Sequence, residues 1–314
     1  GLLTGAIVTF FVGCGLMVWG LEASAGQGLG GTILGTLFTP YCAGFENLVF
    51  AAILARSGGD GREVVINSLV NNVTNLTILI GLPAVIWSGV APRKGERRGR
   101  KEATNDAEPA LNRLSLLLTL AAALFFTGAL WVVGRDGRID FNDGLILVGA
   151  FLFWQVFHVF GVLKRRLTAE RPWGLGILID FVLLGVAAWG IYISIDWLVI
   201  WLGSTKSAVV SPEYLGWLSG WLMVLPNGLL AFYYGWKRRP EMTCSSQIGD
   251  GHICVPLGIG LFALVRPIQV PALFQSGIYL LAGAAVFTFL LFLFFGRVNR
   301  PAGIVLVGTY VWFV

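Results

Sequence analysis

Short clusters of charged residues divide the chain into long apolar runs. Between charged residues lie six long runs with no Asp, Glu, Lys or Arg: 23–45, 64–92, 114–134, 144–163, 214–236 and 267–296. A helix needs about 20 apolar residues to cross a hydrocarbon core of about 30 Å, so each run can span a membrane. The runs are continuous, unlike the alternating strands of about 10 residues in a membrane barrel, so they predict helices.

Shorter and charge-bearing runs extend this set to ten predicted spans. They are residues 3–21, 30–55, 64–88, 111–133, 142–163, 173–202, 213–236, 246–266, 271–296 and 301–314. The pattern therefore predicts an all-α polytopic membrane protein with about ten transmembrane helices.

The composition supports this class. Only 12% of the 314 residues are charged, about half the share in a soluble domain, and the mean hydropathy is +0.78. The chain is too apolar for a disordered protein, lacks collagen periodicity and has too few cysteines for a disulfide scaffold. We therefore expect the lipid bilayer as its surroundings.

The basic residues predict an orientation. Most of the 22 Lys and Arg residues lie in four loops, 89–113, 163–172, 237–241 and 297–300, which ten spans place on one side of the membrane. Because cytoplasmic loops are enriched in Lys and Arg, both termini are expected on the non-cytoplasmic face, most simply of a plasma (inner) membrane. Since most of the basic residues lie in these loops, we interpret the net charge of +5 as an orientation signal and expect no nucleic-acid partner.

The two halves of the chain resemble each other. Segment 143–154 and segment 302–313 both carry glycines five residues apart before an aromatic end, and Trp19-Gly20 recurs as Trp189-Gly190. Residues 1–162, with the basic loop 89–113, and residues 173–314 are therefore predicted to form two repeats of five helices. An odd number of helices inverts the second repeat across the membrane, as in many secondary transporters.

Polar residues within the spans mark the candidate site, because they are costly in a bilayer. Glu46 lies deep in the second span, after Pro40 and Gly44, which we expect to unwind the helix. The third span carries Ser68, Asn71 and Asn75 on one helical face. The second half has a corresponding set in Asn227 and the polar segment 246–256.

These segments resemble the cation/Ca2+ exchanger superfamily. The family's third-helix pattern, Asn-x-x-Gly-Ser-Asn-x-x-Asn-x5-Gly, is met in the first half by Asn67, Val70, Asn71, Asn72, Asn75 and Gly81. In the second half, Gly249, Asp250, Gly251, Cys254 and Gly260 occupy its positions from the first Gly onward. Glu46 matches the Glu that ends the family's Gly-Thr-Ser-x-Pro-Glu motif, and Asn227 stands at the same place in the second half.

The resemblance implies a secondary cation antiporter with a site at mid-membrane. The implied ion ligands are Glu46, Asn71, Asn75, Asn227 and Asp250, with carbonyls near Gly44 and Gly249. Hard cations such as Ca2+ take six to eight oxygen ligands, so we expect Ca2+ exchanged for Na+ or H+, with no covalent cofactor. His252, close to Asp250, is a candidate proton-handling group.

Two other functions remain open at this point. Asn227 in place of the acid favours a monovalent cation/proton antiporter, or a transport-inactive subunit with protein partners in a larger membrane complex. An enzyme is not expected, because no nucleophile–base pair and no cysteine–histidine metal motif stands out.

Overall fold

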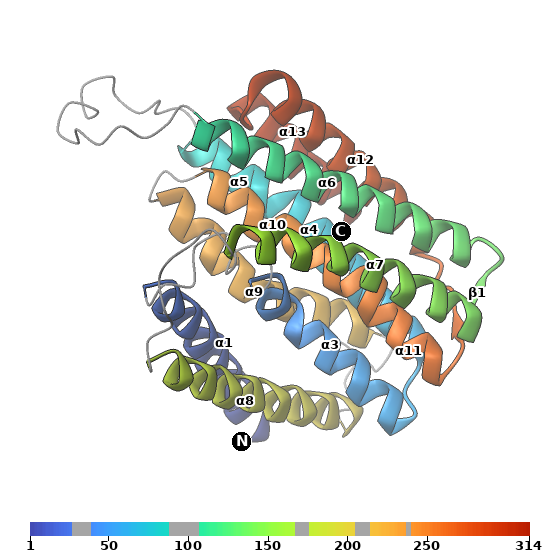
Figure 1. Cartoon of the computed structure of the whole chain (residues 1–314). Helices are drawn as coiled ribbons and strands as arrows, with labels where there is room; N and C mark the ends of the chain where they lie inside the picture. Colours follow the sequence, from blue (N-terminus) through green and yellow to red (C-terminus); the bar gives the residue numbers. More distant parts are fainter. Residues whose placement is uncertain (27–38, 88–106, 167–175, 205–213, 237–239) are drawn as a thin grey trace.

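The computed structural model describes residues 1–26, 39–87, 107–166, 176–204, 214–236 and 240–314, and these are almost entirely helical (Figure 1). The helices of the first half are α1 (Leu2–Gly26), α3 (Thr39–Ser57), α4 (Gly61–Leu76), α5 (Ile78–Trp87), α6 (Ala107–Gly134) and α7 (Phe141–Arg166). Those of the second half are α8 (Gly176–Ser204), α9 (Leu215–Trp236), α10 (Pro240–Ile253), α11 (Ile259–Val265), α12 (Phe274–Phe295) and α13 (Arg300–Phe313).

Counted over the described residues, with α4–α5 and α10–α11 as one span each, the helices make ten spans. Within the part of the chain that the structure describes, six helical segments are long and apolar enough to cross a bilayer: Gly61–Trp87, Leu116–Gly134, Leu178–Trp201, Leu215–Trp236, Ser246–Val265 and Phe274–Phe295. The all-α polytopic membrane architecture predicted from the sequence is confirmed.

Glycine contacts join the two halves in a symmetrical way. A Cβ on Gly81 would lie 2.8 Å from the carbonyl oxygen of Gly303, and a Cβ on Gly303 would lie 2.8 Å from that of Gly81. In the same manner, a Cβ on Gly144 would lie 2.9 Å from the carbonyl oxygen of Gly260. In the predicted repeat, Gly81 corresponds to Gly260 and Gly144 to Gly303. The Gly81–Gly303 contact and the Gly260–Gly144 contact therefore join equivalent pairs of positions.

The third span of each half is interrupted at the corresponding place. The first break is at Thr77, between α4 and α5. The Thr77 hydroxyl donates a hydrogen bond to the main-chain carbonyl of Val73. The second is a π-helical turn, Cys254–Gly258, which contains Pro256. Thr77 and Pro256 each stand four residues before the matching glycine, Gly81 or Gly260, so both repeats carry the break.

The described part of the second span is not unwound at Gly44, and the turn before Pro40 lies outside the described residues. Helix α3 begins at Thr39 and continues without a break through Glu46. Pro40 lies in its first turn, where the missing N–H of proline costs no helical hydrogen bond.

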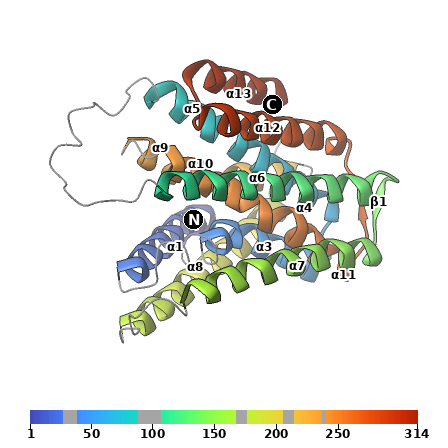
Figure 2. The same ribbon diagram turned by 45° about the horizontal axis from the view of Figure 1, so that its top comes forward.

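Helices α1 and α8 form a pair at one side of the molecule. They pack far more extensively against each other than against any other helix. Figures 1 and 2 show them side by side, with α3 between them and the remaining helices. Gly13 allows this close approach, because a Cβ there would lie 2.9 Å from the Ile191 side chain and 3.1 Å from the Ala187 carbonyl oxygen.

A two-stranded antiparallel ladder connects the α6–α7 turn to the α11–α12 turn. It pairs β1 (Arg138–Ile139) with β2 (Ile268–Gln269), with Arg138 opposite Gln269. Gly137, at φ +88°, forms the turn that precedes β1, and its carbonyl accepts a hydrogen bond from the Val270 N–H at 3.0 Å. The ladder ties the two halves together at one end of the helices.

Candidate ion site

Helix α4 carries a polar stripe that is buried along its whole length. Its members are each at most 4% exposed: Asn67, Ser68, Asn71, Asn72, Thr74 and Asn75, followed by Thr77 at the break. Part of the stripe is bonded within the helix, since Asn72 Nδ2 donates to the Ser68 carbonyl at 2.7 Å. Asn67 Nδ2 donates across to Ser219 Oγ of α9 at 3.0 Å. Polar groups that lipid could not satisfy are therefore turned towards other helices.

Glu46 lies in α3 and is 2% exposed. Helix α3 contacts both α1 and α8. Helix α3 packs against α4 and α10, the two helices that precede the breaks. The structure thus places the predicted carboxylate in the protein interior, beside the α1–α8 pair.

The third spans of the two repeats meet at their polar positions. Asn71 Nδ2 donates to Cys254 Sγ at 3.8 Å, and Ser68 Oγ donates to the Cys254 carbonyl at 3.4 Å. The Asn72 carboxamide oxygen lies 2.7 Å from where a Cβ on Gly251 would be. Asn72 and Gly251 occupy the same position of the third-helix pattern in the two halves, so matching positions of the two spans lie side by side here.

Asn227 is buried in α9 and is joined to α10 through its main chain. Gln247 Nε2 donates to the Asn227 carbonyl at 3.1 Å and to Ser246 Oγ at 2.9 Å. Pro226, in the middle of α9, does not end that helix. Helices α3, α4, α9 and α10 therefore surround the predicted residues, with contacts between each neighbouring pair.

Asp250 and His252 both lie in α10. Asp250 belongs to α10, but its side chain lies outside the described part of the chain. His252 is buried and turned towards α6 and α7: its Nε2 is 2.7 Å from the Thr119 carbonyl, and its ring makes edge contacts with Phe126 and Trp154. These contacts lie on the opposite side of the helix from Cys254, so the structure does not bring His252 together with Asn71.

The structure adds residues that the sequence argument did not select. Gln247 and Asn47 are buried, and the Gln247 side-chain oxygen and both Asn47 side-chain polar atoms have no hydrogen-bond partner among the described residues. The sequence did contain a signal for Gln247, because it precedes Cys254 by seven residues and shares its helical face. Asn47 gave no such signal, since it follows Glu46 directly and matches no pattern position.

The described residues offer a cation mainly neutral oxygen ligands. No three His, Cys, Asp or Glu side chains among them are grouped closely enough to hold a metal ion. A soft-metal centre of thiolates and imidazoles is therefore not formed by this part of the chain. The arrangement instead combines one buried carboxylate with amide, hydroxyl and main-chain oxygens, which suit a hard cation.

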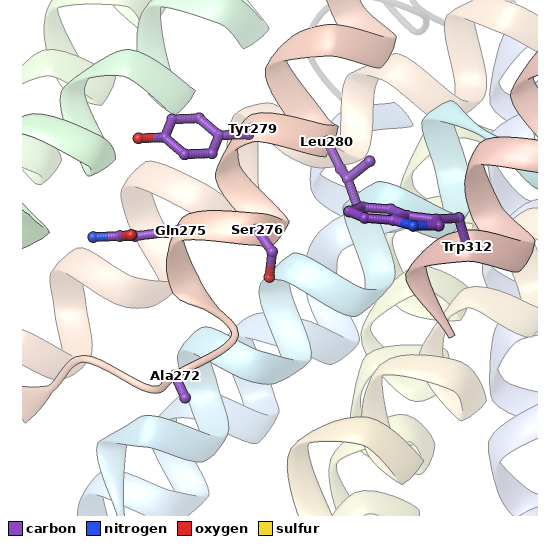
Figure 3. A pocket seen from close by; sticks show the side chains of 6 residues that line it. All are labelled: Ala272, Gln275, Ser276, Tyr279, Leu280 and Trp312. Carbon is purple, nitrogen blue, oxygen red and sulfur yellow. The ribbon is translucent and has the colours of Figure 1, made fainter.

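Two surface cavities lie apart from these residues. One, of about 500 Å³, is formed by α12 and α13 and is lined by Ala272, Gln275, Ser276, Tyr279, Leu280 and Trp312. Figure 3 shows Tyr279 and Gln275 extending to one side of α12, while Leu280 lies beside Trp312. The other, of about 340 Å³, lies beside β1 and the end of α11. Neither cavity is lined by the buried polar residues, which are enclosed by helices.

Comparison with known proteins agrees with this geometry. The family model described as "Sodium/calcium exchanger protein" matches residues 1–160 and 179–314. The fold is similar to the NCX_Mj sodium-calcium exchanger soaked with 2.5 mM Na+ and 10 mM Sr2+, with 15% identity, a TM-score of 0.66, and 99% of this chain and 96% of that chain covered. The sodium/calcium exchanger from Methanococcus jannaschii gives 16% identity and a TM-score of 0.63 at the same coverage. No curated protein matches the chain.

Proposed function

The chain belongs to the sodium/calcium exchanger family, and from that membership we propose that it exchanges Ca2+ for Na+ or H+ by alternating access at the buried site around Glu46. As a member of this family it is an integral membrane cation exchanger that acts on small inorganic cations. The exchanged ions, the residues that bind them and the mechanism are parts of the proposal.

The burial of Glu46 carries the proposal. A carboxylate in the interior of a membrane protein is costly and is usually retained for function. Glu46 is buried in a helix that packs against two broken spans, and those spans present Asn71 and Cys254 to each other. A cation among these groups would offset the cost of burying the carboxylate.

The ligand chemistry favours Ca2+ among divalent cations. Glu46, Asn71, Asn75, Asn227 and Asp250 are the proposed side-chain ligands, all of which offer oxygen. Ca2+ accepts carboxylate, amide and main-chain oxygens in flexible geometry, whereas Mg2+ demands a near-ideal octahedron and keeps several waters. Carbonyls released at the two helix breaks would complete the shell, as in other transporters with discontinuous helices.

The α1–α8 pair supports the alternating-access part of the proposal. These helices pack mainly against each other, and both also contact α3, which carries Glu46. Movement of the pair relative to α3 would open the site to one side of the membrane and then to the other. The remaining helices, tied by the glycine crossings and the β1–β2 ladder, would stay fixed.

Transport by the Glu46→Gln variant tests this proposal. Purified protein is reconstituted into liposomes that are loaded with Na+ or with protons. Uptake of ⁴⁵Ca2+, driven by the outward gradient of Na+ or protons, is then measured. We expect the variant to lose at least 100-fold in initial rate, because the amide keeps the size of the side chain and removes its charge. Asp136→Asn is the matched control, since Asp136 is exposed in the turn before β1 and should leave the rate unchanged. Wild-type Ca2+ flux in Glu46→Gln would contradict the proposal.

The neutral residue Asn227 supports a second candidate function, exchange of a monovalent cation for protons. Asn227 is neutral at the position where the family pattern has an acid, and this lowers the charge available to a divalent ion. A monovalent cation/proton antiporter needs less negative charge. The same liposomes distinguish the two candidates: Na+- or K+-driven proton movement without Ca2+ uptake would favour the monovalent exchanger. An absence of flux for every ion would favour a transport-inactive subunit of a membrane complex.

A further inference from the structure

The orientation of the Gln247 carboxamide is determined by its hydrogen bonds. The side chain is fully buried in α10, and its Nε2 donates to the Asn227 carbonyl and to Ser246 Oγ. A main-chain carbonyl can only accept, so the nitrogen of the amide must face it. The side-chain oxygen, Oε1, therefore points away from the main-chain carbonyl of Asn227.

Oε1 is buried and accepts no hydrogen bond from the described residues. A buried carbonyl oxygen without a hydrogen-bond partner is costly, because it has given up its hydrogen bonds to water. Natural proteins leave few such groups, and those that persist usually interact with an ion or water. Oε1 thus identifies a position at which the protein offers an oxygen to something outside the chain.

The helical position of Gln247 shows where that oxygen is offered. Gly251 and Cys254 follow it by four and seven residues and share its face of the α10 span. Gly251 lies against Asn72 and Cys254 against Asn71, so this face looks towards α4. Its counterpart in the first repeat is Ser68, whose hydroxyl donates to the Cys254 carbonyl.

We infer that Gln247 Oε1 is a ligand of the transported cation and supplies the second repeat with a neutral oxygen where Asn227 has replaced the acid. The inference rests on the function proposed above and deepens it. Amide oxygens are ordinary ligands of hard cations, so a neutral ligand here completes an oxygen shell without adding charge. The residue also links the ion to α9, because its Nε2 bonds to the main chain of Asn227.

The test compares two glutamines of the same chain. Gln247→Leu removes the inferred ligand, whereas Gln275→Leu makes the same substitution on the exposed surface of α12, outside the site. Uptake of ⁴⁵Ca2+ into liposomes is measured against Ca2+ concentration. We expect Gln247→Leu to raise the KM for Ca2+ at least tenfold and Gln275→Leu to leave it within twofold of wild type.

A second variant keeps the inference testable if Gln247→Leu does not yield a monodisperse protein. Gln247→Glu keeps the size of the side chain and adds a charge, so it should lower the KM for Ca2+ at least fivefold at pH 8. A KM within twofold of wild type in the variants that fold would overturn the inference.

Failure of this inference is distinguishable from failure of the proposed function. Flux that is lost in Glu46→Gln but unchanged in both Gln247 variants overturns the role of Gln247 alone. An absence of cation flux in the wild-type protein overturns both.

Discussion

At the scale of single residues, the contact between the two repeats depends on a pair of unequal size. Asn72 of α4 occupies the space in front of Gly251 of α10, and the two residues are equivalent in the repeat. Asn72 is held there by its hydrogen bond to the Ser68 carbonyl. The neighbouring Ser68, Asn71 and Cys254 depend on the same close approach for their contacts. The geometry of the candidate ion site is therefore sensitive to the volume of one side chain.

Substitution of Gly251 should destabilise the protein through Asn72. The Cβ of Gly251→Ala would lie 2.7 Å from Asn72 Oδ1. Either the Asn72 side chain rotates and gives up its hydrogen bond to the Ser68 carbonyl, or one helix shifts, and we expect a loss of about 1–3 kcal/mol in unfolding free energy. Adding Asn72→Ala removes the obstructing group and should recover part of that loss. Thermal unfolding of both single variants and the double variant gives the coupling energy, which should exceed about 0.5 kcal/mol. Strictly additive effects would show that the two residues do not oppose each other.

At the scale of helices, the apolar runs were sufficient to predict the spans, and the breaks were only partly predictable. Pro256 and the surrounding glycines indicated an interruption in the second half, and the structure places a π-helical turn there. The break at Thr77 has no proline, and its sequence, Asn75-Leu76-Thr77-Ile78, reads as an ordinary helix. Pro40, by contrast, suggested unwinding and lies at a helix start. A proline in the sequence shows only that one backbone N–H donor is missing. Whether the helix breaks there depends on how it packs against its neighbours.

The candidate site was predictable to a similar extent. Burial of Glu46, the α4 stripe and Asn227 followed from polar residues in apolar runs, because such residues must face protein. Gln247 carried only a weaker signal, its place on the helical face of Cys254, because its particular role depends on a hydrogen bond to the main chain of another helix. Contacts of that kind depend on how helices cross, which residue spacing within one helix does not specify.

Two glycines of α7 provide a test of the helix crossings. Gly144→Ala brings a Cβ within 2.9 Å of the Gly260 carbonyl oxygen, whereas Gly149→Ala on the same helix meets nothing within 4 Å. We expect the first variant to lose about 1–3 kcal/mol in stability because backbone cannot move aside locally. The second should be neutral or up to about 1 kcal/mol more stable, since alanine favours the helix. Unfolding monitored by circular dichroism in detergent measures both variants, and equal stabilities would contradict the assigned crossing.

At the scale of the whole molecule, the protein consists of a pair of helices beside a larger, interlocked group. The larger group is joined by the two glycine crossings and by the β1–β2 ladder, all of which connect one half to the other. The α1–α8 pair also combines one helix from each half, and both of its helices contact α3, which carries Glu46. Both the fixed and the proposed moving parts are therefore shared between the repeats.

The distribution of Lys and Arg predicts how this assembly sits in the membrane. Asn142, at the start of α7, should face the non-cytoplasmic side, and Arg297, after α12, the cytoplasm. We expect a membrane-impermeant maleimide to label Asn142→Cys in intact cells, and Arg297→Cys only after lysis. Labelling in the reverse order would invert the proposed orientation. The wild-type chain is the control, and its described cysteines, Cys14, Cys244 and Cys254, are all buried.

The unequal pair at Asn72 and Gly251 also limits how such a protein can be assembled from parts. Two copies of the first half, associated as a homodimer, would bring Asn72 against its own copy, and two copies of the second half would bring glycine against glycine. The first arrangement has too much volume at the axis and the second too little. Under the predicted repeat, the two halves are therefore complementary at this contact, and neither can replace the other.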